Sequence, residues 1–252
     1  MSFDFKGKKY LVTGAGQGIG RAIALKLAKH GSKVYALSRS KEPLDSLVAE
    51  HPGIHPIVAD IGNWEEIREK LADIEALDGL VNNAAVMSME NIPGLEWSRE
   101  ILQKSFNTNV LGSINVIQMV GKKMVETGRS GSIVNISSIT SLQALPSKLP
   151  YCVSKAGLDM VTKQFALELG SNNIRVNSVN PTLVATERVN QAIKSGSPFA
   201  KVFTSRTPMK RLAEVDEIVS PVLYFLSDMS SMVSGTIHVV DGGAMASFVT
   251  DI

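Results

Sequence analysis

A tyrosine, a lysine and a serine in the second half of the chain have side chains that can move a proton together. Tyr151 and Lys155 are four residues apart, and Ser138 lies thirteen residues before the tyrosine. If residues 150–170 form a helix, the phenol and the ammonium lie on one face, one turn apart. The ammonium would then lower the pKa of the phenol from its ordinary value near ~10. A substrate carbonyl held by the Tyr151 and Ser138 hydroxyls could accept a hydride at its carbon.

Apolar runs that end in turn residues alternate with stretches of helical periodicity, and this alternation predicts how the three side chains are positioned. It is typical of a doubly wound parallel sheet with helices on both faces. We predict an α/β fold, a single-domain, Rossmann-like three-layer αβα sandwich over residues 1–252 with a seven-stranded parallel sheet. The expected strands are 8–14, 33–37, 55–59, 78–81, 131–138, 175–179 and 236–240. The expected helices are 21–29, 43–50, 64–74, 97–127, 150–170 and 214–227.

The first expected strand runs into a glycine-rich turn, TGAGQGIG at 13–20, and a helix follows. Glycines let the backbone approach a pyrophosphate, and the helix N-terminus offers free N–H groups and a positive dipole end. Glycines often only make tight turns, but strand, turn and helix in this order predict a dinucleotide site. After the fourth strand, the run NNAA at 82–85 supplies small residues against which a flat ring can lie.

The second expected strand ends in Ser38, Arg39 and Ser40, about twenty residues beyond the glycine turn. An acidic side chain here would accept hydrogen bonds from a free ribose 2′-hydroxyl and repel a 2′-phosphate, whereas an arginine and two hydroxyls do the reverse. The sequence therefore predicts NADP(H) as the cofactor in preference to NAD(H). The alternative interpretation is a solvated arginine at the end of a strand.

Composition argues against several classes of protein. The chain has 252 residues, of which 44% are hydrophobic and 20% charged, and its net charge is +2. Its basic residues are dispersed, so nothing indicates a nucleic-acid partner, and no apolar run reaches the ~18–20 residues of a membrane span. The start, MSFDFKGKKY, has no apolar signal core, and the single cysteine, Cys152, excludes an internal disulfide and a multi-cysteine metal site. We expect a cytoplasmic protein without a metal site.

Residues 182–213 interrupt the alternation of strands and helices. The segment is long and mixed in composition, and Gly196, Pro198 and Pro208 punctuate it. These features predict a mobile substrate lid. An ordinary surface excursion is the alternative.

Taken together, these motifs resemble those of the short-chain dehydrogenase/reductase family over essentially the whole chain. The matching segments are TGAGQGIG at 13–20, Asp60 after the third strand, NNAA at 82–85, Asn109, Ser138, YCVSK at 151–155, NPTLVAT at 180–186 and DGG at 241–243. In this order and spacing they include both a cofactor turn and a catalytic set.

The resemblance implies a role for each matching residue. Tyr151 would be the general acid, Ser138 would hold the substrate oxygen, and Lys155 would lower the pKa of Tyr151 and bind the nicotinamide ribose. Asn109 would fix a water that links Lys155 to solvent. The implied cofactor-binding residues are Gly14, Gly16, Gln17, Gly18, Ile19, Gly20, Ser38, Arg39, Ser40, Asp60, Ile61, Asn83, Ala84, Ala85, Tyr151, Lys155, Pro181, Val184 and Thr186.

Within this family the chain is similar to the dicarbonyl/L-xylulose reductases. That similarity implies NADPH-dependent reduction of L-xylulose to xylitol and of small α-dicarbonyls such as diacetyl, by a homotetramer packed through residues 97–127 and 150–170. Two positions depart from it. Gln17 stands where NADP-preferring relatives often have a basic residue, and Lys148 stands where we expect a histidine.

Three alternatives stay open at this point. The chain could reduce a different ketone, such as a 3-oxoacyl thioester or a steroid, because the 182–213 segment does not decide the substrate. It could be a non-catalytic NADP(H)-sensing protein on an inherited fold, although all four reactive residues are present. Cys152, next to Tyr151, could sense oxidation.

Overall fold

Parallel strands form the central sheet of the computed structural model, which describes residues 4–246. The strands are β1 Lys9–Thr13, β2 Lys33–Ser38, β3 Ile54–Val58, β4 Gly79–Asn82, β5 Gly131–Ile136, β6 Ile174–Pro181 and β7 Ile237–Val240. They pair in the order β3-β2-β1-β4-β5-β6-β7, which confirms the predicted seven-stranded parallel sheet. Residues 1–3 and 247–252, which the domain prediction included, lie outside the described residues.

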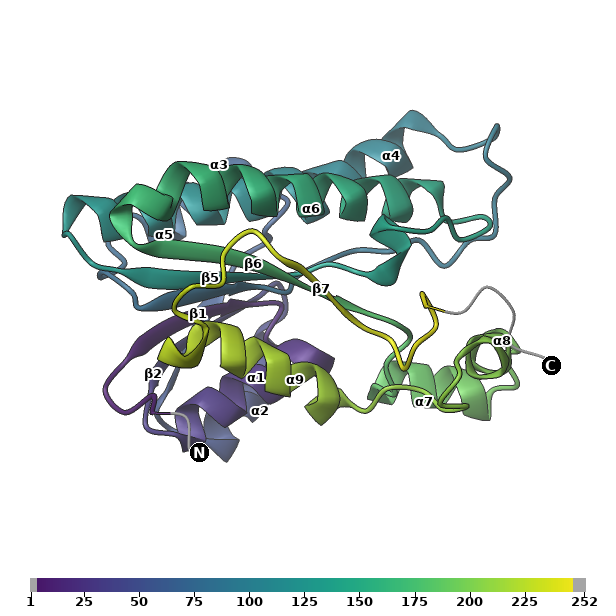
Figure 1. Cartoon of the computed structure of the whole chain (residues 1–252), viewed down its shortest axis with the longest axis horizontal. Coiled ribbons are helices and arrows are strands. Elements are labelled where there is room, and N and C mark those ends of the chain that lie inside the picture. The colour runs from purple at the N-terminus through teal and green to yellow at the C-terminus, as the bar shows by residue number, and fades with distance from the viewer. Residues whose placement is uncertain (1–3, 247–252) are drawn as a thin grey trace.

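Two layers of helices cover the sheet (Figure 1). One face carries α1 Gly18–Lys29, α2 Lys41–Glu50 and α9 Val215–Leu226, and the other carries α3 Trp64–Leu71, α4 Arg99–Phe106, α5 Ser113–Glu126 and α6 Leu149–Leu169. Three short 3-10 turns complete these connections: η2 Ile139–Ser141, η3 Gly170–Asn172 and η4 Asp228–Ser230. The predicted three-layer sandwich is confirmed. Within residues 4–246, no helix combines the length and the apolar character that crossing a bilayer requires.

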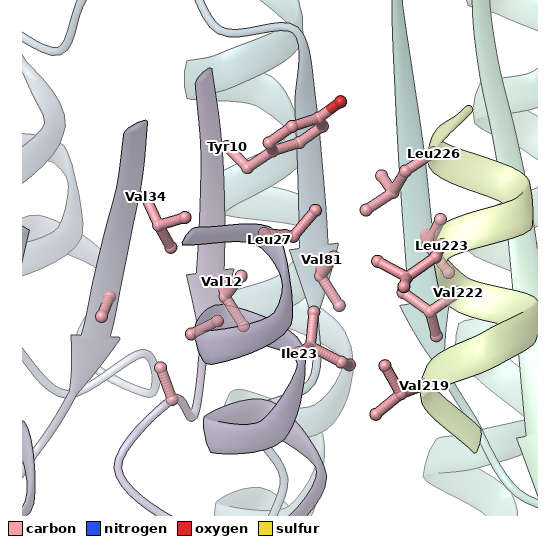
Figure 2. Packing of buried hydrophobic residues seen from close by; sticks show 14 of the residues in the cluster. Tyr10, Val12, Ile23, Leu27, Val34, Val81, Val219, Val222, Leu223 and Leu226 are labelled. Carbon is pink, nitrogen blue, oxygen red and sulfur yellow. The ribbon is translucent and has the colours of Figure 1, made fainter. Parts of the chain in front are cut away.

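Alternate strand residues pack into different cores because successive side chains point to opposite faces of a sheet. On β1, Val12 belongs to the core beneath α1 and α9, whereas Leu11 belongs to the core beneath α3 and α5. Figure 2 shows Ile23 and Leu27 of α1 facing Leu223 of α9 across the first of these cores. Each fully buried aliphatic side chain of this kind stabilises the fold by about 1.5–3 kcal/mol. The sheet is therefore held from both sides.

The long helix predicted over 97–127 is divided into three parts. A π-helix, η1 Asn107–Gly112, separates α4 from α5 at the polar interruption that the sequence indicated. A Cβ on Gly112 would lie 2.5 Å from the carbonyl oxygen of Ile61, so the chain passes that loop too closely for any other residue. π-helical turns are frequent at functional sites, and this one carries Asn109.

The 182–213 segment contains two helices that the sequence analysis did not predict, α7 Glu187–Lys194 and α8 Phe199–Arg206. The Thr186 side chain caps α7 by accepting from the N–H of Val189. A short parallel bridge between Val184 and Ala213 closes the base of the segment. Figure 1 places α7 and α8 beyond one end of the sheet.

Candidate active site

The carboxyl ends of parallel strands meet at one edge of the sheet, and the predicted site residues follow these ends. The strand order reverses direction between β1 and β4, which is where doubly wound folds bind ligands. The glycine turn follows β1, Asn83 follows β4, and Ser138 follows β5. Pro181 closes β6. The topology thus brings segments 13–20, 82–85, 138 and 181 to one edge.

The glycine turn is built for close approach. A Cβ on Gly16 would lie 2.9 Å from the hydroxyl of Ser38, and one on Gly20 would lie 2.4 Å from the side-chain amide of Asn83. Gly18 has a φ of +55°, a conformation that side chains rarely allow. The first turn of α1 holds no acidic residue, and its N-cap, Gln17, makes no capping bond. The free N–H groups at this helix start fit a pyrophosphate.

Asn83 ties this turn to β4. Its side-chain amide donates to the carbonyls of Thr13 and Gly14, at 3.1 Å each. The Thr13 hydroxyl in turn accepts from the backbone N–H groups of Asn83 and Ala84 at 3.0 and 3.1 Å. Both amide hydrogens of Asn83 are therefore used within the protein, and its side chain shapes the cofactor cleft from behind.

A cleft of about 570 Å³ runs from the glycine turn past the ends of β2 and β3. It contains most of the predicted cofactor residues: Gly14, Gly16, Gln17, Gly18, Ile19, Ser38, Arg39, Ser40, Asp60, Ile61, Asn83, Ala84, Ala85 and Thr186. The predicted residues that do not line it are Gly20, Tyr151, Lys155, Pro181 and Val184. Of these, Gly20, Lys155, Pro181 and Val184 are buried, and Tyr151 is half-buried. The residues present fit a dinucleotide, whose adenosine and phosphate half would occupy this cleft.

Eight of the residues that line this cleft were not among the predicted cofactor residues. They are Leu37, Pro43, Ala59, Val86 and Thr108, together with Glu187, Arg188 and Gln191 of α7. The three α7 residues belong to the segment predicted as a substrate lid, so part of that segment covers the cofactor cleft. No local pattern connects Arg188 with the glycine turn, because the two are about 170 residues apart in the chain.

The two charges at the end of β2 and β3 are loosely paired. The guanidinium of Arg39 and the carboxylate of Asp60 are 4.0 Å apart, and their side chains are 59% and 45% exposed. Asp60 also accepts from the N–H of Gly62 at 2.9 Å. An exposed ion pair of this length contributes little to stability, so Arg39 is available for a phosphate.

Ser138 is held from two sides at the start of η2. Its Oγ accepts from the N–H of Thr140 at 3.1 Å and from the Thr140 hydroxyl at 2.9 Å. Its carbonyl accepts from Ser141 Oγ at 2.7 Å and from Asn180 at 3.0 Å. Because a hydroxyl oxygen has two acceptor positions and one hydrogen, the Ser138 hydrogen stays available for donation.

Tyr151 lies in the first turn of α6, after Pro150. Burial raises its pKa to about 12, and the Ser138 hydroxyl opposes that shift. The lowered pKa predicted from the sequence is therefore not what this arrangement produces, because burial disfavours the phenolate more than the Ser138 hydroxyl favours it. Tyr151 is a neutral phenol at neutral pH, which is the form that a proton donor needs.

Lys155 lies one turn further along α6, as the spacing predicted, and its side chain is almost fully buried. Its Nζ donates to the carbonyl of Ile136 at 2.7 Å and lies 5.7 Å from the centre of the Tyr151 ring. Burial lowers the pKa of Lys155 to about 8, against the opposite effect of the Asp159 carboxylate. A fixed ammonium thus lies beside the ring of the phenol at neutral pH.

Asn109 links the cofactor cleft to α6. Its side-chain amide donates to the carbonyl of Val86 and to Ser154 Oγ, both at 2.9 Å, and its Oδ1 accepts from the N–H of Val86 at 2.8 Å. Val86 lines the cleft, and Ser154 is the residue before Lys155. Both amide hydrogens are used, so a relay water at Asn109 would have to bind an oxygen of this residue.

Comparison with known proteins agrees with this geometry. A family model described as "Enoyl-(Acyl carrier protein) reductase" matches residues 14–245. L-xylulose reductase of Mus musculus is 44% identical over 246 residues, which are 98% of this chain and 100% of that protein. D-erythrulose reductase of Gallus gallus is 42% identical over 97% of this chain and 98% of its own length. Carbonyl reductase [NADPH] 2 of Sus scrofa is 42% identical over 98% of this chain and all of that protein.

Solved structures agree as well. A gluconate 5-dehydrogenase from Burkholderia cenocepacia, in complex with NADP and tartrate, superposes with a TM-score of 0.88 at 28% identity. The match covers 97% of this chain and 98% of that one. The cleft and the fold are therefore those of a protein that binds a nicotinamide cofactor.

Proposed function

Because the chain belongs to the short-chain dehydrogenase/reductase family and is an oxidoreductase acting on CH–OH groups, we propose that it reduces L-xylulose to xylitol with NADPH. We propose small α-dicarbonyls such as diacetyl as further substrates. The names of the relatives support this choice, since two of them are reductases of short ketoses, L-xylulose and D-erythrulose.

The observation that carries the proposal is the protonation and bonding state of two hydroxyls. Ser138 accepts two hydrogen bonds from Thr140 and keeps its own hydrogen for donation. Tyr151 is a neutral phenol, because burial raises its pKa to about 12. Two hydroxyls in these states suit a carbonyl oxygen, which only accepts hydrogen bonds.

The chemistry divides between the cofactor and the chain. When bound, the dihydronicotinamide supplies the hydride that reduces the carbonyl carbon. Ser138 donates a hydrogen bond to the substrate oxygen, and Tyr151 transfers its proton to that oxygen as negative charge develops there. Lys155, held on the Ile136 carbonyl, stabilises the phenolate that this transfer leaves behind.

Arg39 supports NADPH as the cofactor. Its only ion pair among residues 4–246 is the 4.0 Å contact with Asp60. Ser40, at the N-cap of α2, makes no capping bond with its side chain, so its hydroxyl is also available. A 2′-phosphate would be bound by a guanidinium and flanking hydroxyls. If Arg39 moved to the phosphate, the Asp60 carboxylate would lose this ion pair and keep its hydrogen bond from the N–H of Gly62.

We assign residues 182–213 as the substrate lid of this enzyme. The Val184–Ala213 bridge makes a narrow base, and the two helices beyond it carry few buried residues. Phe199 and Phe203 pack against each other with ring centres 4.8 Å apart. A segment tied at its base and packed mainly on itself can open and close over a substrate.

The proposed assembly is a cytoplasmic homotetramer packed through the predicted helical regions 97–127 and 150–170. An apolar stripe along the outside of α6 supports it, since Val153, Met160 and Leu167 recur every seven residues. Met160 is 61% exposed and Leu167 is 79% exposed. A stripe of this kind is typical of a helix that packs on a partner subunit.

Initial-rate oxidation of NADPH, followed by absorbance, tests the function directly. L-xylulose and diacetyl are assayed side by side, with NADH as the control cofactor and a 3-oxoacyl thioester as the control substrate. We expect turnover of both substrates with NADPH strongly preferred. No turnover of either, together with rapid reduction of the thioester, would contradict the proposal.

A further inference from the structure

A third ionisable side chain follows Tyr151 and Lys155 on the same face of α6. Asp159 lies one turn beyond Lys155, and it is 7% exposed. A buried carboxylate is costly unless hydrogen bonds compensate for its lost hydration. The proposed proton transfer assigns this carboxylate no role.

The partners of Asp159 are neutral. Its Oδ2 accepts from the side-chain amide of Asn180 at 2.9 Å. Its Oδ1 lies 3.2 Å from Ser178 Oγ, whose one hydrogen is shared with Asn180 Oδ1 at 2.6 Å. Among residues 4–246 it forms no ion pair within 4.0 Å. Its full charge therefore acts on its surroundings.

Asn180 connects Asp159 to Ser138 through the hydrogen bonds of its side-chain amide. The same Nδ2 that faces Asp159 also lies 3.0 Å from the carbonyl oxygen of Ser138 and 2.8 Å from Ser141 Oγ. A carboxylate can only accept, so it requires the nitrogen side of the Asn180 amide to face this way. With the amide reversed, two oxygens would meet at Asp159 and the Ser138 carbonyl would lose a donor.

The charge of Asp159 also reaches Lys155. Tyr151 and Asp159, both on α6, are the titratable groups that face this ammonium. The elements packed around the network contribute neutral side chains: Asn109 from η1, Ser138 from the β5–η2 junction, Ser141 from η2, and Ser178 and Asn180 from β6. Asp159 is thus the one anion that favours the charged form of Lys155 among the described residues.

We propose that Asp159 is a positioning residue of the reaction, which fixes the backbone of Ser138 through Asn180 and serves as the counter-charge of Lys155. The proposal rests on the proposed function. It goes beyond that function by placing a fifth residue in the network, one that touches neither cofactor nor substrate.

The first test is Asp159→Asn, with Asp216→Asn as the control, because Asp216 is an exposed carboxylate on α9, outside the cleft and outside the helical regions of the proposed assembly. We expect kcat to fall about 10- to 100-fold, as for a small misplacement of a catalytic group. The KM for NADPH should change less than about twofold, because no cleft residue is altered. The alkaline fall of kcat should also move to lower pH, since Lys155 loses the charge that raises its pKa. An unchanged kcat and pH profile would overturn the proposal.

The double variant D159N/N180D separates positioning from mere structure. It exchanges the amide and the carboxylate, so one donor and one acceptor again face each other, but a carboxylate at position 180 cannot donate to the Ser138 carbonyl. We expect Tm to recover relative to the single variant while kcat stays low. Recovery of both would show that Asp159 only maintains the fold and would overturn the proposal.

A measurement without substrate keeps the two proposals distinguishable. Titration of the ¹³Cε signal of Lys155 by NMR, assigned with Lys155→Met, should give a lower midpoint in Asp159→Asn than in the wild type. If the wild type reduces neither L-xylulose nor diacetyl, the proposed function fails, but this shift still tests Asp159. An unchanged midpoint would remove its role as counter-charge whatever the substrate is.

Discussion

The two halves of the carboxyl edge of this sheet are built differently. The hydroxyl and carbonyl of Ser138 and the ammonium of Lys155 each form hydrogen bonds within the protein, at 2.7–3.1 Å. At the far end of the cleft, Arg39 and Asp60 are exposed and share one contact of 4.0 Å. The difference indicates a division of labour. The groups that handle the proton are fixed before any ligand binds, whereas the groups that choose the cofactor remain available to it.

Tyr151→Phe gives the largest effect if this division holds. Loss of the proton donor should lower kcat for carbonyl reduction by about 10²–10⁴-fold, with no change in NADPH affinity. Steady-state kinetics at saturating NADPH measure this. Tyr224→Phe, on α9, is the matched control and should behave as the wild type. If Tyr151→Phe kept most of its kcat, another group would be the proton donor, and the proposed division of labour would be wrong.

Among the groups that handle the proton, Lys155→Met should change activity and stability in opposite directions. We expect kcat to fall about 10²-fold and Tm to rise by about 2–8 °C, because a buried charge is replaced by an apolar side chain of similar length. Since burial depresses the pKa of Lys155 to about 8, the stability difference should be complete below pH 8 and shrink as pH rises toward its ordinary value of 10.5. Thermal unfolding at several pH values measures it, and a lower Tm at pH 7 would contradict the account.

Arg39→Ser tests the end of the cleft that selects the cofactor. The preference for NADPH over NADH, taken as the ratio of their kcat/KM values, should fall about 10- to 100-fold, because a charge-assisted hydrogen bond to the 2′-phosphate is lost. Turnover at saturating cofactor should change little. Arg206→Ser on α8, outside the cleft, is the control. An unchanged preference would transfer the phosphate contact to another cation, with Arg188 as the next candidate.

The pH dependence of the wild type should give the smallest effect. Lys155 is charged below its pKa of about 8 and loses that charge above it, so kcat for reduction should decline as pH rises through this value. The decline should be only partial at pH 8 and larger near pH 9, because one group titrates. Rates at saturating substrates across this range measure it. A rate that stays constant to pH 10 would show that the ammonium is not needed.

Local patterns were enough to predict the parallel sheet, the glycine turn and the placement of Ser138, Tyr151 and Lys155. Hydrophobic periodicity and short motifs are properties of residues close together in the sequence, so they predict the elements that such residues specify. They could not predict α7 and α8, which depend on the Thr186 cap and the Val184–Ala213 bridge. The π-helix at 107–112 depends on the close passage of Gly112 past Ile61.

The direction of the Tyr151 pKa shift was wrong for a similar reason. The one-turn spacing to Lys155 is visible in the sequence, but the burial that raises the pKa of Tyr151 arises from tertiary packing, and only the Ser138 hydroxyl opposes it. Arg188 was not predicted to line the cofactor cleft for a similar reason, because it comes from a helix that is distant in the sequence. Asp159 could have been noticed as a third member of the i, i+4 series on α6.

Titration of NADPH into the wild type, Tyr151→Phe and Arg39→Ser, followed by nucleotide fluorescence, tests the division of labour most directly because it measures binding without chemistry. The account predicts a Kd for Tyr151→Phe equal to that of the wild type, and one for Arg39→Ser raised about 10- to 100-fold. A Kd that rises with the loss of the Tyr151 hydroxyl and is unaffected by the loss of the Arg39 guanidinium would contradict it.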